Sequence, residues 1–206
     1  MRRPFLLTTL LLACLAPQEK QIPTAKPVPE PYDNEEAYKV YAEVLPKEWV
    51  WTVAKASGLV IQQETTRFPN EPPDRTCIKL NEASKSDWQE VIENYLLNNQ
   101  APRLLLPKIP IEKPYELVPR SRIPFPYGSG NQQDEYWIGI TKRVGNYGGI
   151  LSFSAVGFNR TRDKALVYMG HHCGGLCGGG THYFLEKVDG KWKPGKVSAM
   201  VCFWAS

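Results

Sequence analysis

Residues 164–190 read KALVYMGHHCGGLCGGGTHYFLEKVDG, and this stretch decides the expected fold. Apolar residues at 165–169 and 181–188 predict two strands, and Asp189-Gly190 predicts a tight hairpin after them, because both central positions favour positive φ. Outward from this stretch, Leu151 to Val156 predict a preceding strand, and the alternation from Val197 to Trp204 predicts a following one. The four segments together predict a four-stranded antiparallel meander.

The N-terminal half of the chain predicts helices. A helix is expected from about Glu35 to Leu45, with Asp33-x-x-Glu36 as a capping-box-like start and Pro46 as its stop. A second helix is expected after Ser86-x-x-Gln89, because one apolar face recurs at Trp88, Val91, Ile92, Tyr95 and Leu96. Short strands are expected at 59–61, 104–106 and 115–118. The expected fold class is therefore α+β, with N-terminal helices packed on a C-terminal four-stranded antiparallel meander.

The first residues read as an export signal. Arg2 and Arg3 precede an apolar run that is long enough for a secretory signal and too short to span a bilayer. Leu11-Leu-Ala-Cys14 resembles the bacterial lipobox, which implies a lipid on Cys14 as the mature N-terminus, although Leu12 departs from the usual small or β-branched residue. Ordinary cleavage after Ala16, giving a secreted soluble protein, and an uncleaved segment are the alternatives.

Three segments are expected along the chain: a signal peptide at 1–16, a Pro-rich disordered tether at 17–32, and a single globular domain at 33–206. The tether holds five prolines between Pro17 and Pro31, which keep it extended. The formal charge of +4 falls to +2 once Arg2 and Arg3 leave with the signal, and no basic and aromatic cluster accompanies it. The expected partner is thus the membrane, through the lipid, and not a nucleic acid.

The cysteines are expected to form disulfides. Besides Cys14 the chain has Cys77, Cys173, Cys177 and Cys202, an even number in an oxidising compartment. Gly-Gly-Leu between Cys173 and Cys177 allows a tight loop, which favours that pair and leaves Cys77 with Cys202. Free buried thiols are the alternative.

All three histidines lie in the segment 171–182, together with two of the cysteines. His171, Cys173, Cys177 and His182 form an alternative set of ligands for a tetrahedral zinc site. The disulfide interpretation is preferred, because oxidation removes both thiolates; no cofactor is then expected, the histidines are expected to be exposed, and the glycines are expected to form a tightly turning loop.

The motifs Val156-Gly-Phe-Asn159, Ala165-Leu-Val-Tyr168, Cys173-Gly-Gly-Leu-Cys-Gly178 and Gly190-Lys-Trp192 resemble a group of uncharacterised exported bacterial (lipo)proteins. The resemblance implies no activity. The sequence also lacks a nucleophile elbow and a phosphate-binding loop. We therefore expect a lipid-anchored protein of the cell envelope that acts as a non-catalytic binding or structural module, with an exported hydrolase or a metal-binding protein using the 171–182 segment as the alternatives.

Overall fold

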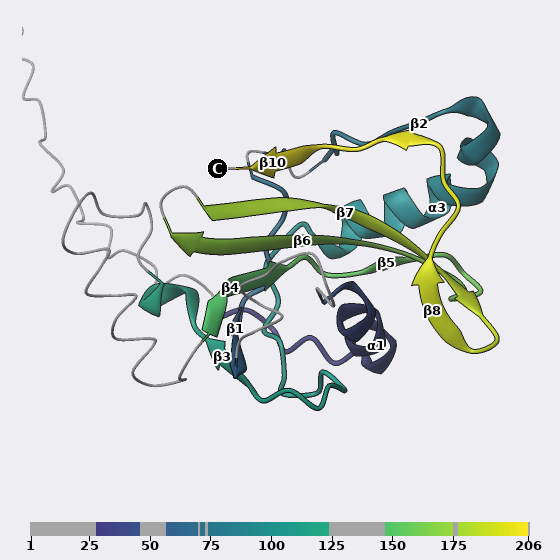
Figure 1. Cartoon of the computed structure of the whole chain (residues 1–206). Helices are drawn as coiled ribbons and strands as arrows, with labels where there is room; N and C mark the ends of the chain where they lie inside the picture. Colours follow the sequence, from purple (N-terminus) through teal and green to yellow (C-terminus); the bar gives the residue numbers. More distant parts are fainter. Residues whose placement is uncertain are drawn as a thin grey trace, which may run out of the picture.

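The computed structural model describes residues 28–45, 57–69, 71–72, 74–123, 147–174 and 177–205 (Figure 1). A mixed eight-stranded sheet lies at its centre, in the order β10-β7-β6-β4-β1-β3, with β5 beside β6 and β8 beside β7. Its strands are β1 (Gly58–Gln62), β3 (Tyr115–Val118), β4 (Tyr147–Phe153), β5 (Gly157–Phe158), β6 (Lys164–Gly174), β7 (Cys177–Val188), β8 (Lys191–Pro194) and β10 (Phe203–Ala205). A separate two-stranded sheet joins β2 (Lys79–Leu80) to β9 (Ala199–Met200).

The expected fold class, with helices packed on a four-stranded antiparallel meander, is wrong. β1 comes from the N-terminal half and pairs in parallel with both β3 and β4, so the sheet is wider and mixed. The single strand expected from Val197 onward is divided: β9 pairs with β2, and β10 pairs with β7. Parallel pairing joins segments that are distant in the chain and carries no local turn signal, which explains why the sequence pattern did not indicate it.

The two α-helices among the described residues are α1 (Glu35–Val44) and α3 (Glu82–Asn98), and a 3-10 turn, η1, spans Arg120–Arg122. Helix α1 begins close to the expected position, with the side chain of Asn34 rather than Asp33 as its cap. Helix α3 begins four residues before Ser86, because Asn81 Oδ1 accepts the Ser84 N–H at 3.0 Å. Either amide oxygen satisfies an N–H that has no partner within its helix.

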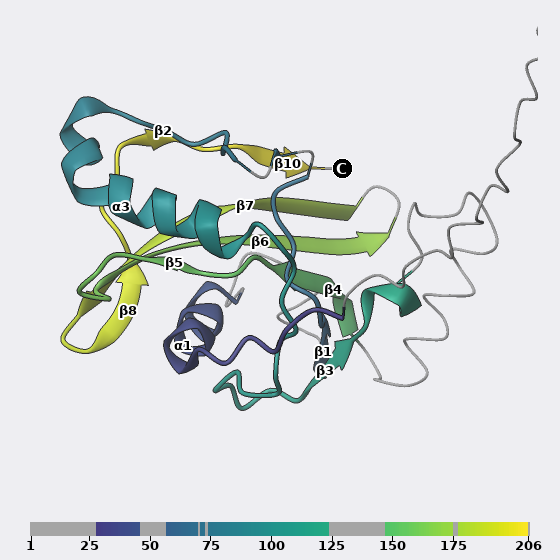
Figure 2. The same ribbon diagram turned by 180° about the vertical axis from the view of Figure 1, so that it is seen from behind.

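Helices α1 and α3 pack on opposite faces of the sheet, and in both views strands lie between them (Figures 1 and 2). Successive side chains of a strand point to opposite faces. Along β6, Ala165 and Val167 therefore join the core around α1, whereas Leu166 joins the core around Trp88 and Tyr95 of α3. We name the two sides the α1 face and the α3 face.

Several local expectations are confirmed. Strands cover 59–61 and 115–118, and the β7–β8 hairpin turns at Asp189 (φ 52°) and Gly190 (φ 75°) as expected. Tyr32, at the end of the expected tether, is buried, and its N–H donates to the Leu104 carbonyl at 2.7 Å. The expected signal peptide, the lipidation at Cys14 and most of the tether lie outside the described residues. No helix in the described ranges is long and apolar enough to cross a membrane.

Candidate ligand-binding site

The histidines of the 171–182 segment are divided between the two faces of the sheet. His182 pairs directly with Tyr168 across the β6–β7 ladder, so both lie on the α3 face, together with His172. His171 and Cys173 lie on the α1 face, where Cys173 Sγ is 3.8 Å from His171 Nδ1. The described members of the proposed ligand set, His171, Cys173 and His182, are therefore divided between the two faces, and no group of three His, Cys, Asp or Glu side chains in the described part of the chain is arranged to hold a metal.

His171 and His182 are buried, contrary to the expectation that they would be exposed. His171 Nε2 lies 2.5 Å from the Gly148 carbonyl, which can only accept, so this nitrogen carries the proton. Burial lowers the pKa of His171, and burial together with the neighbouring His171 lowers the pKa of His172 to about 4. Burial and the charge of Arg67 likewise lower the pKa of His182 to about 4. All three imidazole rings are therefore neutral at pH 7.

The structure contains the expected Cys77–Cys202 disulfide, with a Cα–Cα distance of 5.9 Å. It links the segment before β2 to the C-terminal segment between β9 and β10. Cys173 is also a disulfide cysteine. The side chain of Cys177 lies outside the described residues, so the pairing of Cys173 with Cys177 stays a prediction.

Gly170 of β6 and Gly178 to Gly180 of β7 lie within the ladder of these two strands, whereas Gly175 of the expected turning loop lies outside the described residues. Gly170 and Gly180 face each other in the ladder, and a Cβ on Gly180 would lie 2.4 Å from Trp204 Nε1 and 2.5 Å from Tyr168 Oη. Trp204, from the edge strand β10, thus lies across the glycines, stacks on His172 at 4.4 Å between ring centroids and donates from Nε1 to Tyr168 Oη at 2.8 Å. The glycines are required by this close approach of two aromatic side chains.

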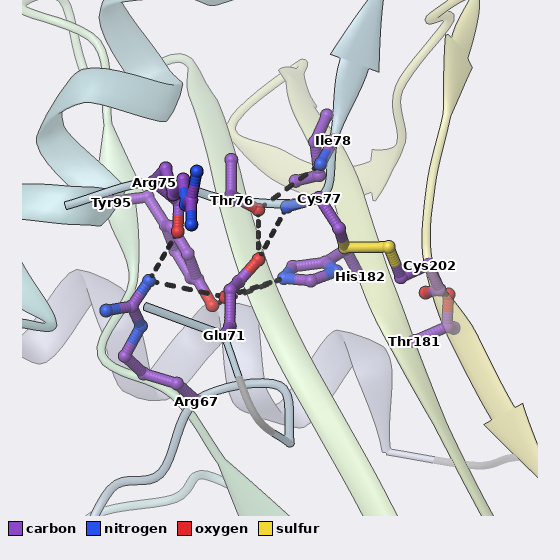
Figure 3. Close-up of a disulfide and its surroundings, with 10 residues drawn as sticks. All are labelled: Arg67, Glu71, Arg75, Thr76, Cys77, Ile78, Tyr95, Thr181, His182 and Cys202. Atoms are coloured by element: carbon purple, nitrogen blue, oxygen red, sulfur yellow. Dashed lines mark hydrogen bonds and ion pairs between the residues drawn. A yellow bond between two sulfur atoms is a disulfide. The ribbon is translucent and has the colours of Figure 1, made fainter. Parts of the chain in front are cut away.

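His182 lies within an aromatic and charged network that includes the segment before the disulfide (Figure 3). Its ring stacks on Phe68 and meets Tyr95 edge-on, and Tyr95 Oη is 3.2 Å from Nε2. The buried carboxylate of Glu71 is 4.0 Å from the same nitrogen, and because the imidazole is neutral this contact is not an ion pair at pH 7. Glu71 nevertheless favours the tautomer with the proton on Nε2.

Glu71 also fixes the loop that carries Arg67. Its Oε1 accepts the Thr76 hydroxyl and the Cys77 N–H, the latter at 2.9 Å, and its Oε2 is 3.4 Å from Arg67 Nη2. Arg67 Nη2 donates in addition to the Arg75 carbonyl at 2.9 Å. The guanidinium is thereby held at a defined place above the α3 face (Figure 3).

A hollow of about 310 Å³ opens on the part of the α3 face that α3 does not cover. Its floor consists of Ile150, Ser152, Tyr168 and His172 of β4 and β6. Its walls come from the end of β1, the loop after it and the turn η1: Gln62, Thr66, Arg67, Phe68, Pro69, Arg120 and Ile123. This volume is at the lower end of the range for small-molecule sites, roughly 300–1,000 Å³.

A second hollow of about 250 Å³ adjoins the first. The two share Thr66, Arg67 and Arg120, so the arginines lie at the boundary between them. The second hollow adds Glu71 and Asn99, which already take part in internal bonds: Asn99 Nδ2 donates to the Ala155 carbonyl and Asn99 Oδ1 accepts the Ala155 N–H, both at 2.8 Å. The first hollow is therefore the better candidate for a ligand site.

Of the residues proposed from sequence as metal ligands, the three whose side chains are described (His171, Cys173 and His182) do not line the first hollow, although their neighbour His172 does. The sequence did not indicate Arg67, Glu71 and Arg120, because Arg120 is distant from the other two in the chain and the three come together only in the folded structure. The sequence does contain a signal for the role of Trp204: glycines inside a strand suggest a close approach, and aromatic residues at a nearby edge cover such glycines.

Comparisons of the chain with family models, with curated proteins and with solved structures found no match. The geometry of the hollow is therefore the basis for the function proposed below.

Proposed function

We propose that the protein is an exported binding module that takes a small ligand into the hollow on the α3 face. The observation that carries this proposal is the combination of a preformed cavity of about 310 Å³ with an uncharged floor and a few fixed polar groups at its wall. The Cys77–Cys202 disulfide supports an exported location, because such bonds persist in oxidising compartments.

The geometry favours binding over catalysis. Among the described residues the buried imidazole of His182 is covered by Phe68, Tyr95 and Tyr168, so it does not face the hollow as a base. Ser152 Oγ, which does face it, has only a long contact of 3.5 Å with the Gly170 carbonyl. A nucleophile needs an adjacent base to activate it, and Ser152 has none in the described part of the site.

The hollow is tested by a fragment screen that follows the backbone amide shifts of ¹⁵N-labelled protein. The expected result is a set of fragments that shift Ile150, Ser152 and His172 and leave α1 unchanged. Ser152→Leu should abolish these shifts by filling the hollow, whereas Ser86→Leu, the same change on the exposed side of α3, should not. Fragments that bind only elsewhere, or equally well to the filled variant, would refute the site.

We further propose that the mature protein is attached to a membrane through a lipid on Cys14, with the Pro-rich segment as a tether. The motif that supports this is Leu11-Leu-Ala-Cys14. Intact-mass measurement of protein extracted from membranes should show a diacylated cysteine at the N-terminus, and Cys14→Ser should remain unprocessed. A mature mass without acyl chains would rule out the anchor.

A further inference from the structure

We infer that the ligand of the hollow is a small anion, a carboxylate or phosphate ester attached to a flat apolar body; this rests on the proposed binding function. The inference comes from the placement of two guanidiniums at the wall, an uncharged flat floor, and the size of the cavity.

Arg67 is the fixed cationic group. Its side chain is only 14% exposed, and Glu71 from one side and the Arg75 carbonyl from the other hold its Nη2. A guanidinium has five N–H donors in a rigid plane, and the hydrogen bonds formed among the described residues use Nη2 alone. An arginine that is already oriented loses little conformational entropy when it binds an oxyanion.

Arg120 provides the second positive charge. It lies in η1, which follows β3, and like Arg67 it lines both the first and the second hollow. Two carboxylates lie nearby, but outside the first hollow: Glu71 contacts Arg67 from the second hollow, and Glu64 Oε2 accepts the backbone N–H of Arg120 at 2.7 Å. No described residue that lines the first hollow is acidic, so its electrostatic preference is for an anion.

The floor is suited to a flat apolar group. Ile150 and the ring of Tyr168 lie on it beside His172, and Phe68 stands at the wall. His172 is stacked on Trp204 and is neutral at pH 7, so the floor adds no charge that would compete with the arginines for the anion. A cavity of about 310 Å³ has room for one substituted ring rather than an extended chain.

Three probes of similar shape test the inference: 4-hydroxybenzoate, its neutral amide 4-hydroxybenzamide, and phenyl phosphate. Binding is followed by the amide shifts of the ¹⁵N-labelled protein and by the Trp204 indole N–H, identified with Trp204→Phe. We expect at least one anion to bind about tenfold or more tightly than the amide, since a charge-assisted hydrogen bond is about twice as strong as a neutral one. The stronger of the two anions identifies the source of the oxyanion.

Arg120→Gln should weaken binding of the anion several-fold and leave binding of the amide unchanged, because it removes one of the two guanidiniums at the wall from an exposed position. Arg67→Lys keeps the charge and should weaken binding less than Arg67→Gln. Arg160→Gln, an exposed site with the same change of net charge, should have no effect. If the amide binds at the hollow as tightly as both anions, or if Arg120→Gln changes nothing, the inference is wrong while the binding function stands. If none of the three probes shifts the hollow, both fail.

Discussion

The two faces of the sheet are built from the same strands and differ in how completely they are covered. On the α1 face, tyrosines of α1 and the buried residues of β4 and β6 form a closed core, in which Tyr41 lies 4.8 Å from Phe153 between ring centroids. On the α3 face, α3 covers one part, the loop before the disulfide covers the next, and the rest stays open as the hollow. Because successive side chains of a strand point to opposite faces, one face of the sheet can be packed in a core while the other is available to bind a ligand.

The largest loss of stability is expected at Phe153, whose side chain is fully buried on the α1 face. Phe153→Ala should lower the free energy of unfolding by about 3–5 kcal/mol, because it removes apolar contacts and leaves a cavity. Denaturant unfolding measures the loss. A loss below about 1 kcal/mol would mean that the α1 face is not the closed core described above.

Removing the Cys77–Cys202 disulfide should have the next largest effect. The double change to serine should lower the stability by about 2–4 kcal/mol, since it frees the unfolded chain from a crosslink between positions 125 residues apart. The amide shifts should change around Phe68, His182 and Trp204 and not in α1. Equal changes on both faces would show that the disulfide stabilises the fold as a whole instead of the α3 face.

Acid should weaken the α3 face through His182. Its folded pKa of about 4 lies below the value of about 6.5 expected in the unfolded chain, so the unfolded state binds the proton first. The stabilisation is complete above pH 6.5 and is lost as the pH falls to about 4, by roughly 2–3 kcal/mol. Tyr95, Tyr168, Phe68, Glu71 and Arg67 surround the ring, and Glu71 is too distant to reverse the effect of burial. Carbon-13 NMR titration of the imidazole measures this directly, and a value near 6.5 would contradict the burial.

The smallest expected effect is that of Ser152, whose hydroxyl faces the hollow. Ser152→Ala should cost less than about 1 kcal/mol, because its bond to Gly170 is long. Ser154 is two residues further on and fully buried, and its Oγ accepts the Tyr168 N–H at 2.8 Å. Ser154→Ala should therefore cost about 1–3 kcal/mol, because it leaves that N–H without a partner. Similar losses of stability for the two serines would contradict the distinction between Ser152, which lines the hollow, and Ser154, which is packed in the core.

Local features of the fold could be predicted from the sequence, and the arrangement of the sheet could not. The helix around Trp88 and the turn at Asp189-Gly190 depend on residues that are close together in the sequence, and both are found in the structure. The parallel pairing of β1 with β3 and β4 joins distant segments, so no local pattern indicated it. The same reason explains the incorrect fold class.

The only feature of the candidate site that the sequence predicted correctly is the disulfide beside it. The even number of cysteines, together with the short Gly-Gly-Leu loop that favours Cys173 with Cys177, predicted by elimination the pairing of Cys77 with Cys202. The segment 171–182 was recognised as unusual, but the division of its histidines between two faces depends on the strand register, which placed His182 opposite Tyr168. Arg67 and Arg120 are distant in the chain, and both line the hollow because the loop after β1 and the turn η1 both border it.

The most direct test of the difference between the faces is a crystal structure of the protein soaked in turn with 4-hydroxybenzoate and with phenyl phosphate. Density for at least one of the two probes should appear on the α3 face, with the ring over Ile150 and Tyr168 and the oxyanion within hydrogen-bond distance of Arg67 or Arg120. Density for both probes confined to other surfaces, with the hollow filled by its own side chains, would contradict the assignment of this face to binding.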